Sequence, residues 1–239
     1  MQEESYDNED EVERIDISDK ITPTILSNLV AAKWTLRRDA SKTIKSLIKG
    51  KHVTSNGLDD MVKTLASRTK DPHKKLIRSF IKLIGLLGTA LGPEAKRFAK
   101  TILPAVILCL KDKAIYNREA ALNTIQAWSD SIGYEPVIRT MGASVQEANT
   151  ELRKSACSWI AQVRITDPIE NAGAIVDGLF KCMHDKIKEV RAEAEMAFAN
   201  VINRTSPAER REYKGNLHGH EQQEFQEMLD KHIERKPKP

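Results

Sequence analysis

Apolar residues recur along the chain at the spacing of amphipathic helices, which come in pairs separated by short polar turns. In residues 35–48 the apolar positions are spaced three to four residues apart, as in Leu36, Ala40, Ile44 and Ile48, and this places them on one face of a helix. Residues 117–132 follow the same pattern, and we expect Trp128 to lie in the core with Trp159. No stretch alternates apolar and polar residues for long, so the pattern predicts an all-helical protein.

Start and stop signals predict where the helices lie. Ser18 is expected to cap a helix that runs to Val30, and Ser55 or Asn56 is expected to open the third helix. Three cap-and-proline signals predict helix starts; they are Asp71-Pro72, Asp167-Pro168-Ile169-Glu170 and Ser206-Pro207-Ala208-Glu209. The helix that begins at Gly92 contains Pro104, which is expected to kink or split it. The other predicted helices are residues 35–48, 134–147, 149–165, 186–203 and 220–233.

The turns between paired helices recur with a period of about 37 to 41 residues. Each turn is polar and carries a basic residue; the turns occupy residues 33–38, 71–75, 112–118, 149–154 and 185–191. Such a period predicts stacked helical hairpins whose turns emerge along one edge, because one hairpin alone cannot bury its apolar face. We therefore expect an all-α solenoid of about six hairpins, the last of them degenerate and more polar.

Charge is unevenly distributed along the 239 residues. The net charge is +4, but residues 1–17 hold eight acids and only Arg14, a net of −7, which leaves +11 for residues 18–239. We expect residues 1–16 to form an acidic, disordered segment, residues 17–233 the domain, and residues 234–239 a basic linker. A basic domain favours an acidic partner, whether a protein, a nucleic acid or a membrane surface.

Residues with catalytic or metal-binding chemistry are scattered. Cys109, Cys157 and Cys182 lie in apolar helical runs, which predicts buried thiols in a reducing compartment. No 18-residue apolar run and no signal-peptide pattern is present, so we expect a cytosolic protein with no membrane contact. His218, His220 and His232 lack the spacing of a metal site. We expect no enzyme activity, no metal and no cofactor.

Several turn residues resemble a known family. The turn at residues 185–191 resembles HEAT repeats, and the first turn, at residues 32–37, resembles the first turn of TOG domains. TOG domains are flat paddles of six HEAT repeats found in the microtubule polymerase and CLASP families. Residues 17–22 and 122–128 are similar to a late, fourth-type TOG domain of a polymerase array, and a CLASP-type domain is the less similar choice. The resemblance spans about residues 17–233.

The resemblance implies a function and a set of contact residues. It implies a module of a larger microtubule-associated protein that promotes polymerisation, organises spindle and centrosomal microtubules, and has further TOG domains in the same chain. Its partner would be αβ-tubulin or the microtubule lattice, its location the cytoplasm and cytoskeleton, and the domain itself a monomer. Trp34 would be the apolar anchor. The implied basic contacts are Lys33, Arg37, Lys74, Lys75, Lys113, Arg118, Arg153, Lys154, Lys186 and Lys188.

Alternatives remain open at this point. Trp34 also fits a half-buried staple of the first hairpin, and Arg118 and Arg191 also fit a structural ladder of Asp and Arg residues. The fourth turn departs from the pattern because it carries Glu151, which leaves open a role on the lattice or an architectural one. The whole domain could instead be a generic HEAT adaptor that binds through its concave face. Specific nucleic-acid binding is not expected, because stacking aromatics are nearly absent from the basic stretches.

Overall fold

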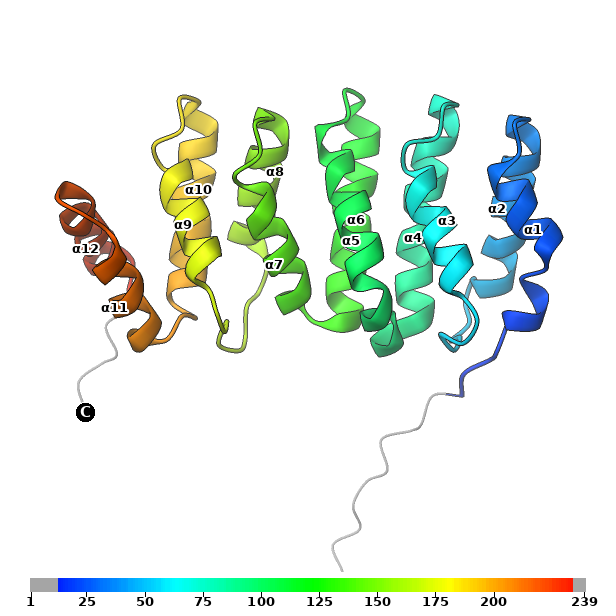
Figure 1. The fold of residues 1–239 in the computed structure, drawn as a ribbon, viewed down its shortest axis with the longest axis horizontal. Coiled ribbons are helices and arrows are strands. Elements are labelled where there is room, and N and C mark those ends of the chain that lie inside the picture. Colours follow the sequence, from blue (N-terminus) through cyan, green and yellow to red (C-terminus); the bar gives the residue numbers. More distant parts are fainter. Residues whose placement is uncertain (1–12, 234–239) are drawn as a thin grey trace, which may run out of the picture.

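The computed structural model describes residues 13–233, which form a row of six helical hairpins (Figure 1). The prediction of an all-helical solenoid is confirmed: within these residues the sole β-type pairing is an isolated bridge between Ile15 and Val53. The α-helices are α1 (Pro23–Val30), α2 (Trp34–Ile48), α3 (Asp59–Arg68), α4 (Lys74–Leu91), α5 (Ala99–Ile107), α6 (Ile115–Ile132), α7 (Tyr134–Ser144), α8 (Thr150–Gln162), α9 (Gly173–Cys182), α10 (Lys188–Ile202), α11 (Pro207–Asn216) and α12 (His220–His232). Short 3₁₀ helices are η1 (Ser18–Lys20), η2 (Gly92–Phe98) and η3 (Leu108–Lys111).

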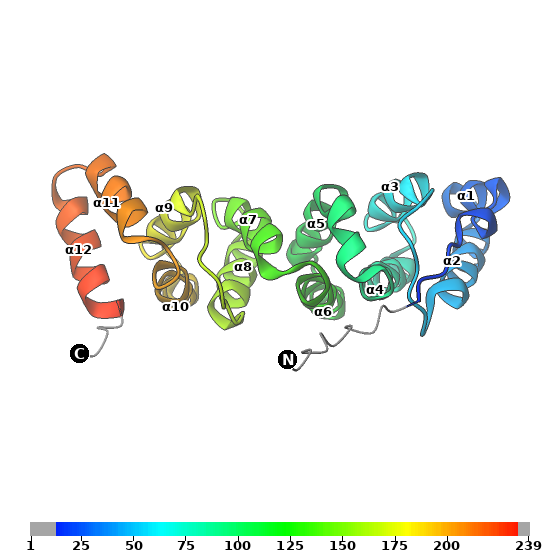
Figure 2. The ribbon, with the colours of Figure 1, turned by 90° about the horizontal axis from the view of Figure 1, so that it is seen from below.

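The hairpins form two layers, with the first helix of each hairpin in one layer and the second helix in the other (Figure 2). The core lies between the layers and runs through the row, from Ile17 to Leu229. The last hairpin contributes least: α11 has no buried residue, and α12 buries Phe225 and Leu229. This polar end agrees with the predicted degenerate sixth hairpin.

The stretch Lys74–Lys111 is the most apolar part of the chain. By length and composition alone it could cross a membrane, with a mean hydropathy of 1.4 over 18 residues. In the fold, however, the chain reverses at η2, and α4 and α5 lie in different layers (Figures 1 and 2). Fully buried side chains such as Phe80, Leu87 and Ile102 place this stretch in the core of the solenoid.

Helices α4 and α6, the second helices of neighbouring hairpins, pack directly against each other. Trp128 is fully buried, as predicted, and its Nε1 donates a hydrogen bond to the carbonyl oxygen of Ile84 at 2.9 Å. Thr124 Oγ1 likewise donates to the carbonyl of Ile81 at 2.9 Å. A Cβ atom on Gly88 would lie 2.6 Å from Trp128 Nε1. The absence of a side chain at Gly88 therefore makes room for the indole and its buried hydrogen bond.

Some predicted helix starts were wrong. Ser18 begins the short η1, and α1 starts at Pro23, with Thr22 Oγ1 accepting a hydrogen bond from the Ile25 amide. The third helix starts at Asp59 instead of Ser55 or Asn56. Pro104 lies inside α5 without splitting it, and the irregular geometry falls in η2 and η3 on either side.

The Asp167-Pro168 signal does not open α9, which starts only at Gly173. The Asp167 carboxylate accepts hydrogen bonds from the Tyr134 hydroxyl at 3.2 Å and from Thr166 Oγ1 at 3.1 Å, so it ties the loop to α7. By contrast, Ser206 and Glu209 form the predicted capping box at the start of α11. At Asp167 the side chain is thus engaged by contacts with α7 and the adjacent Thr166, whereas Ser206 and Glu209 bond each other.

The first described residues contact the solenoid. The Ile15 amide donates to the carbonyl of His52 at 2.9 Å, and Arg14 Nη1 donates to the carbonyl of Leu91 at 2.6 Å. Residues 13–16, predicted to belong to a disordered segment, therefore pack along the solenoid. Residues 1–12 of that segment and the predicted linker at residues 234–239 lie outside the described residues.

A set of arginines closes the turns between paired helices. In four of the first five turns an arginine lies four residues after the helix N-cap, and its Nη1 donates to two carbonyls of its own turn. These residues are Arg37, Arg118, Arg153 and Arg191. In the second turn Ile77 occupies this position. The structural interpretation of Arg118 and Arg191 is thus supported, because each satisfies carbonyls left open at a helix end.

Two of these arginines also join neighbouring hairpins. Arg37 forms a bidentate pair with Asp71 of the next turn, at 2.7 Å from Nε to Oδ2 and 2.8 Å from Nη2 to Oδ1. Arg153 pairs with Asp185 through one oxygen, with Nε 2.8 Å and Nη2 2.7 Å from Oδ2. Asp71 was predicted to cap α4, but its carboxylate is buried against Arg37 and accepts from the His73 amide before the helix begins.

Burial and hydrogen bonding shift the pKa of the Asp71 carboxyl group in opposite directions. Burial alone would raise the pKa of its carboxyl, but the hydrogen bonds from Arg37 and the His73 amide, with the charges of Arg37 and Arg68, hold the pKa below its usual value. The pair therefore stabilises the fold above the ordinary pKa of an aspartate, and this contribution is lost as the pH falls through the lowered pKa.

We expect Gly88→Ala to lower the free energy of unfolding by about 1 to 3 kcal/mol, since the new methyl group would collide with Trp128. Urea denaturation followed by circular dichroism measures this change. The matched control is Gly215→Ala in α11, where a Cβ atom meets nothing within 4 Å. The control should leave stability unchanged or raise it by up to about 1 kcal/mol. Equal effects of the two substitutions would contradict the close crossing.

We expect Asp71→Asn to cost about 3 to 5 kcal/mol at pH 7, because it leaves the Arg37 guanidinium charged and buried without its partner. The difference in the free energy of unfolding from the wild type should narrow as the pH falls below the ordinary aspartate range and through the lowered pKa of Asp71, where the wild-type carboxylate itself becomes protonated. Urea titrations at several pH values test this. Asp39→Asn, which removes the exposed partner of Arg38, is the control and should change stability little.

Candidate functional site

The five turns that carry the recurring polar pattern lie along one edge of the solenoid, at the top of Figure 1. They occupy residues 31–33, 69–73, 112–114, 145–149 and 183–187. The predicted alignment of the turns on one edge is therefore confirmed. We call this surface, with the first residues of the helices that follow, the turn edge.

Trp34 is the first residue of α2 and is 39% exposed. Its ring stacks on the ring of His73 from the second turn, with 4.5 Å between centroids and 9° between planes. The Arg38 guanidinium carbon lies 5.2 Å from the centroid of the Trp34 ring. The Trp34 side chain thus connects the first and second turns, which agrees with a structural role in the first hairpin. The stacking fixes the orientation of its ring, and part of its apolar surface remains exposed.

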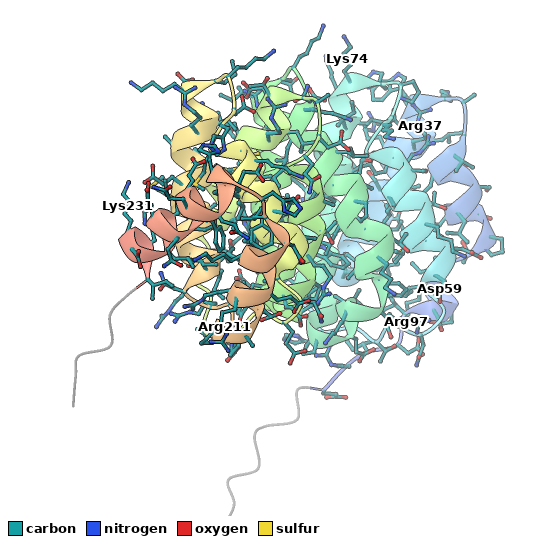
Figure 3. The ribbon with its side chains drawn as sticks, turned by 60° about the vertical axis from the view of Figure 1, so that its left-hand side comes forward. Arg37, Asp59, Lys74, Arg97, Arg211 and Lys231 are labelled. Atoms are coloured by element: carbon teal, nitrogen blue, oxygen red, sulfur yellow. The ribbon has the colours of Figure 1, made fainter. Side chains whose placement is uncertain are left out.

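The predicted lysines populate the turn edge. In Figure 3 Lys74 lies at the upper rim of the molecule, whereas Arg37 lies lower, within the outline of the ribbon. Six lysines are exposed and form no ion pair within 4.0 Å among residues 13–233; they are Lys33, Lys74, Lys75, Lys113, Lys186 and Lys188. Lys154 is half-buried.

The predicted arginines belong to the interior of the turns. Arg37 is only 3% exposed, and the Arg153 side chain is only 12% exposed and paired with Asp185. Arg118 donates to its own turn and is half-buried. The donor groups of these three residues already hold backbone carbonyls or carboxylates, and their role as contacts for a partner stays a prediction.

The aspartates of the turns are engaged by hydrogen bonds within the protein, whereas Glu147 and Glu151 of the fourth turn are exposed. Oδ1 of Asp112 accepts from the Ala114 amide at 2.8 Å, and its Oδ2 accepts from Asn117 at 3.1 Å. Asp185 accepts from the Ile187 amide at 2.9 Å, and these bonds with Arg153 outweigh desolvation and keep the pKa of Asp185 below its usual value. The turn aspartates are thus engaged within the protein, and the six exposed lysines of the edge remain outside any ion pair closer than 4.0 Å among residues 13–233.

Two exposed apolar residues were missed by the sequence analysis. Ile115 is 60% exposed and Tyr116 is 44% exposed at the start of α6, with the Arg78 guanidinium carbon 5.6 Å from the Tyr116 ring centroid. Ile115 occupies the same place after its N-cap as Trp34. Aligning the turns by N-cap would have revealed this equivalence, whereas a helix predicted from residue 117 left both residues out.

The fourth turn interrupts the basic surface. Asn149 Oδ1 accepts from the Leu152 amide at 3.0 Å and caps α8. Glu151 is exposed, with Oε2 3.8 Å from Arg118 Nε. The turn edge is therefore basic and apolar over turns one to three, acidic at turn four and basic again at turn five.

Other reactive groups lie away from this edge or are buried. All three cysteines are free and buried, as predicted, and burial raises the pKa of Cys109 to about 11. The hydrogen bond with Cys182, together with burial, also raises the pKa of Cys157. No group of three or more His, Cys, Asp and Glu residues within residues 13–233 is arranged to hold a metal ion.

The chain is similar in sequence to a known protein family and to several known proteins. The family described as CLASP N terminal matches residues 19–226. Protein MOR1 of Oryza sativa subsp. japonica is 30% identical over 199 residues, which cover 81% of this chain and 10% of that protein. Centrosomal protein 224 of Dictyostelium discoideum is 25% identical over 237 residues, covering 96% of this chain and 12% of that protein. The chain thus spans about a tenth of the length of these relatives.

A solved structure from work on tubulin recruitment and assembly by microtubule polymerases with TOG domain arrays has the same fold. It aligns with a TM-score of 0.71 at 16% identity, over 96% of this chain and 50% of that chain. The family match covers most of the chain, and the relatives agree with the predicted resemblance. This chain therefore belongs to the CLASP N-terminal family and has the fold of a TOG domain.

Proposed function

We propose that this domain binds αβ-tubulin through its turn edge, as a module of a larger microtubule-associated protein that promotes microtubule polymerisation. The observation that carries the proposal is Trp34, which is exposed yet held against His73, at one end of a row of exposed lysines that form no ion pair within 4.0 Å among residues 13–233. The similarity to a structure concerned with tubulin recruitment by TOG domain arrays supports it. The same similarity supports further TOG domains in the full-length protein.

The two kinds of residue have different roles in this proposal. A preoriented tryptophan loses little conformational freedom on binding and buries a large apolar area, so Trp34 supplies binding energy. Exposed lysines at the rim attract an acidic partner and raise the association rate more than they slow dissociation. Turn four, with Glu151, contributes least because its charge repels an acidic surface.

We further propose that the full-length protein acts in the cytoplasm on spindle and centrosomal microtubules. The similarity to Centrosomal protein 224 supports this location. Binding to the soluble dimer and to the lattice are distinguished by comparing anisotropy with αβ-tubulin and co-pelleting with microtubules.

We expect Trp34→Ala to weaken tubulin binding by about 30-fold, the effect of losing a hot-spot side chain worth about 2 kcal/mol. Lys74→Glu with Lys75→Glu should lower the association rate and reduce its salt dependence. Lys100→Glu on α5, away from the turn edge, is the control. Fluorescence anisotropy and stopped flow at low and moderate salt measure these effects.

Thermal unfolding decides between a contact role and a structural role for Trp34. A nearly unchanged melting temperature in Trp34→Ala supports the contact role, and a collapse of the melting temperature assigns Trp34 to the core. Absence of association with both αβ-tubulin and microtubules at low salt would refute the proposed function.

We expect Ile115→Ser and Tyr116→Ser each to weaken binding by about tenfold, since each removes apolar area at the turn edge. Met196→Ser is a matched control, because Met196 is 53% exposed on α10 but lies in the middle of the helix. The same anisotropy assay applies. Silent turn variants would instead favour an adaptor that binds through another face.

A further inference from the structure

A second basic surface lies below the turn edge, in a groove of about 420 Å³ between α2 and α4. The groove is bordered by basic side chains from both helices and has an apolar floor on α4. Its principal residues are Arg38, Lys42, Lys45, Lys82, Leu83 and Leu86.

The positive charges of the groove have few counterions. Lys42, Lys45 and Lys82 are exposed and form no ion pair within 4.0 Å to any of residues 13–233. Helix α4 contains no aspartate or glutamate, and the one acid of α2, Asp39, pairs with Arg38 at 2.9 Å. The groove therefore holds three like charges whose repulsion an acidic ligand would relieve.

The described chain begins close to the lower end of this groove. Ile15 pairs with the segment after α2, and Arg14 reaches the carbonyl of Leu91, the last residue of α4. In Figure 2 this first part of the chain, in dark blue, lies between the ends of α2 and α4. Leu86 of the groove precedes Leu91 by five residues, or about 7.5 Å along the helix. One to two helical turns therefore separate the groove from the contact between Arg14 and Leu91.

The preceding residues have the complementary charge. Residues 1–12 contain six acids and no lysine, arginine or histidine; the acids are Glu3, Glu4, Asp7, Glu9, Asp10 and Glu11. Twelve extended residues reach about 40 Å, whereas the groove extends only about 10 Å from Arg38 to Lys45. The length of the segment is therefore sufficient, and its covalent tether gives it an effective concentration of roughly millimolar near the groove.

We propose that the acidic segment of residues 1–12 docks in the groove between α2 and α4. Its carboxylates neutralise Lys42, Lys45 and Lys82, and the ring of Tyr6 supplies apolar surface for the floor formed by Leu83 and Leu86. Single exposed ion pairs are weak, so the contact depends on several pairs and on the tether. The proposed contact uses a surface other than the turn edge, so its test does not depend on whether the domain binds tubulin.

Paramagnetic relaxation in the full chain tests this contact. A nitroxide is attached at Ser5→Cys, and because the native cysteines are buried, the unsubstituted chain treated with the same reagent is the labelling control. Amide signals of residues 42–45 and 79–86 should lose intensity selectively. Raising the salt from 0.1 to 1 M, which shortens the Debye length from about 10 to about 3 Å, should restore them.

Two sets of substitutions identify the surface. The loss of amide signal intensity should disappear in a triple variant of the groove, Lys42→Glu, Lys45→Glu and Lys82→Glu. It should also disappear in a variant of the acidic segment that leaves the solenoid unaltered, Glu3→Gln, Glu4→Gln, Glu9→Gln and Glu11→Gln. The matched control carries the same charge change on α3, η2 and α5, as Lys63→Glu, Lys96→Glu and Lys100→Glu. The loss of amide signal intensity should remain in this control.

Three results would overturn the proposal. The first is no attenuation, or attenuation spread evenly over the solenoid. The second is an equal loss of the effect in the control triple variant, which would mean that net charge alone matters. The third is attenuation that grows with protein concentration, which would assign the groove to the acidic segment of a second copy.

Discussion

The buried pair between Arg37 and Asp71 is the constraint on which the first half of the turn edge depends. Both side chains are almost fully buried, and the guanidinium bonds the carbonyls of its own turn and the carboxylate of the next. Such a pair contributes little net stability over an apolar replacement, but losing one partner is costly. It therefore fixes the distance and orientation of the two turns, and it brings Trp34 against His73.

Similar hydrogen bonds in the other turns determine which charged side chains are held inside the turn and which face solvent. Arginines and aspartates find backbone and side-chain partners inside the turns, and lysines, which have no such partners, extend into solvent. A guanidinium can bond several carbonyls at once, whereas a lysine ammonium on a flexible stem remains well hydrated at the surface. The turns already carry more basic than acidic residues, and burial of their aspartates leaves the lysines as the charges that face solvent. Helices α2 and α4 extend this basic character away from the edge because they carry a single acid between them.

Much of the fold could be predicted from the sequence, because its determinants are local. Helical periodicity, the repeat of the turns and the Ser206-Glu209 capping box all depend on residues a few positions apart, and each prediction is confirmed. Two of the errors arose where a side chain had a distant competitor. Asp167 has the sequence context of a cap but bonds Tyr134 of α7, and Asp71 has the same context but pairs with Arg37.

The sequence by itself determined the helical class, the stacking of hairpins, the turn edge and the burial of Trp128 and the cysteines. Only the tertiary structure decided which basic residues of a turn face outward. Arg37 and Lys33 are four residues apart and equally charged, yet the arginine is buried because Asp71 of the next hairpin lies beside it. Ile115 likewise became a surface residue through its place in the stack. Periodicity specifies the face of a helix, but the neighbouring repeat determines what covers that face.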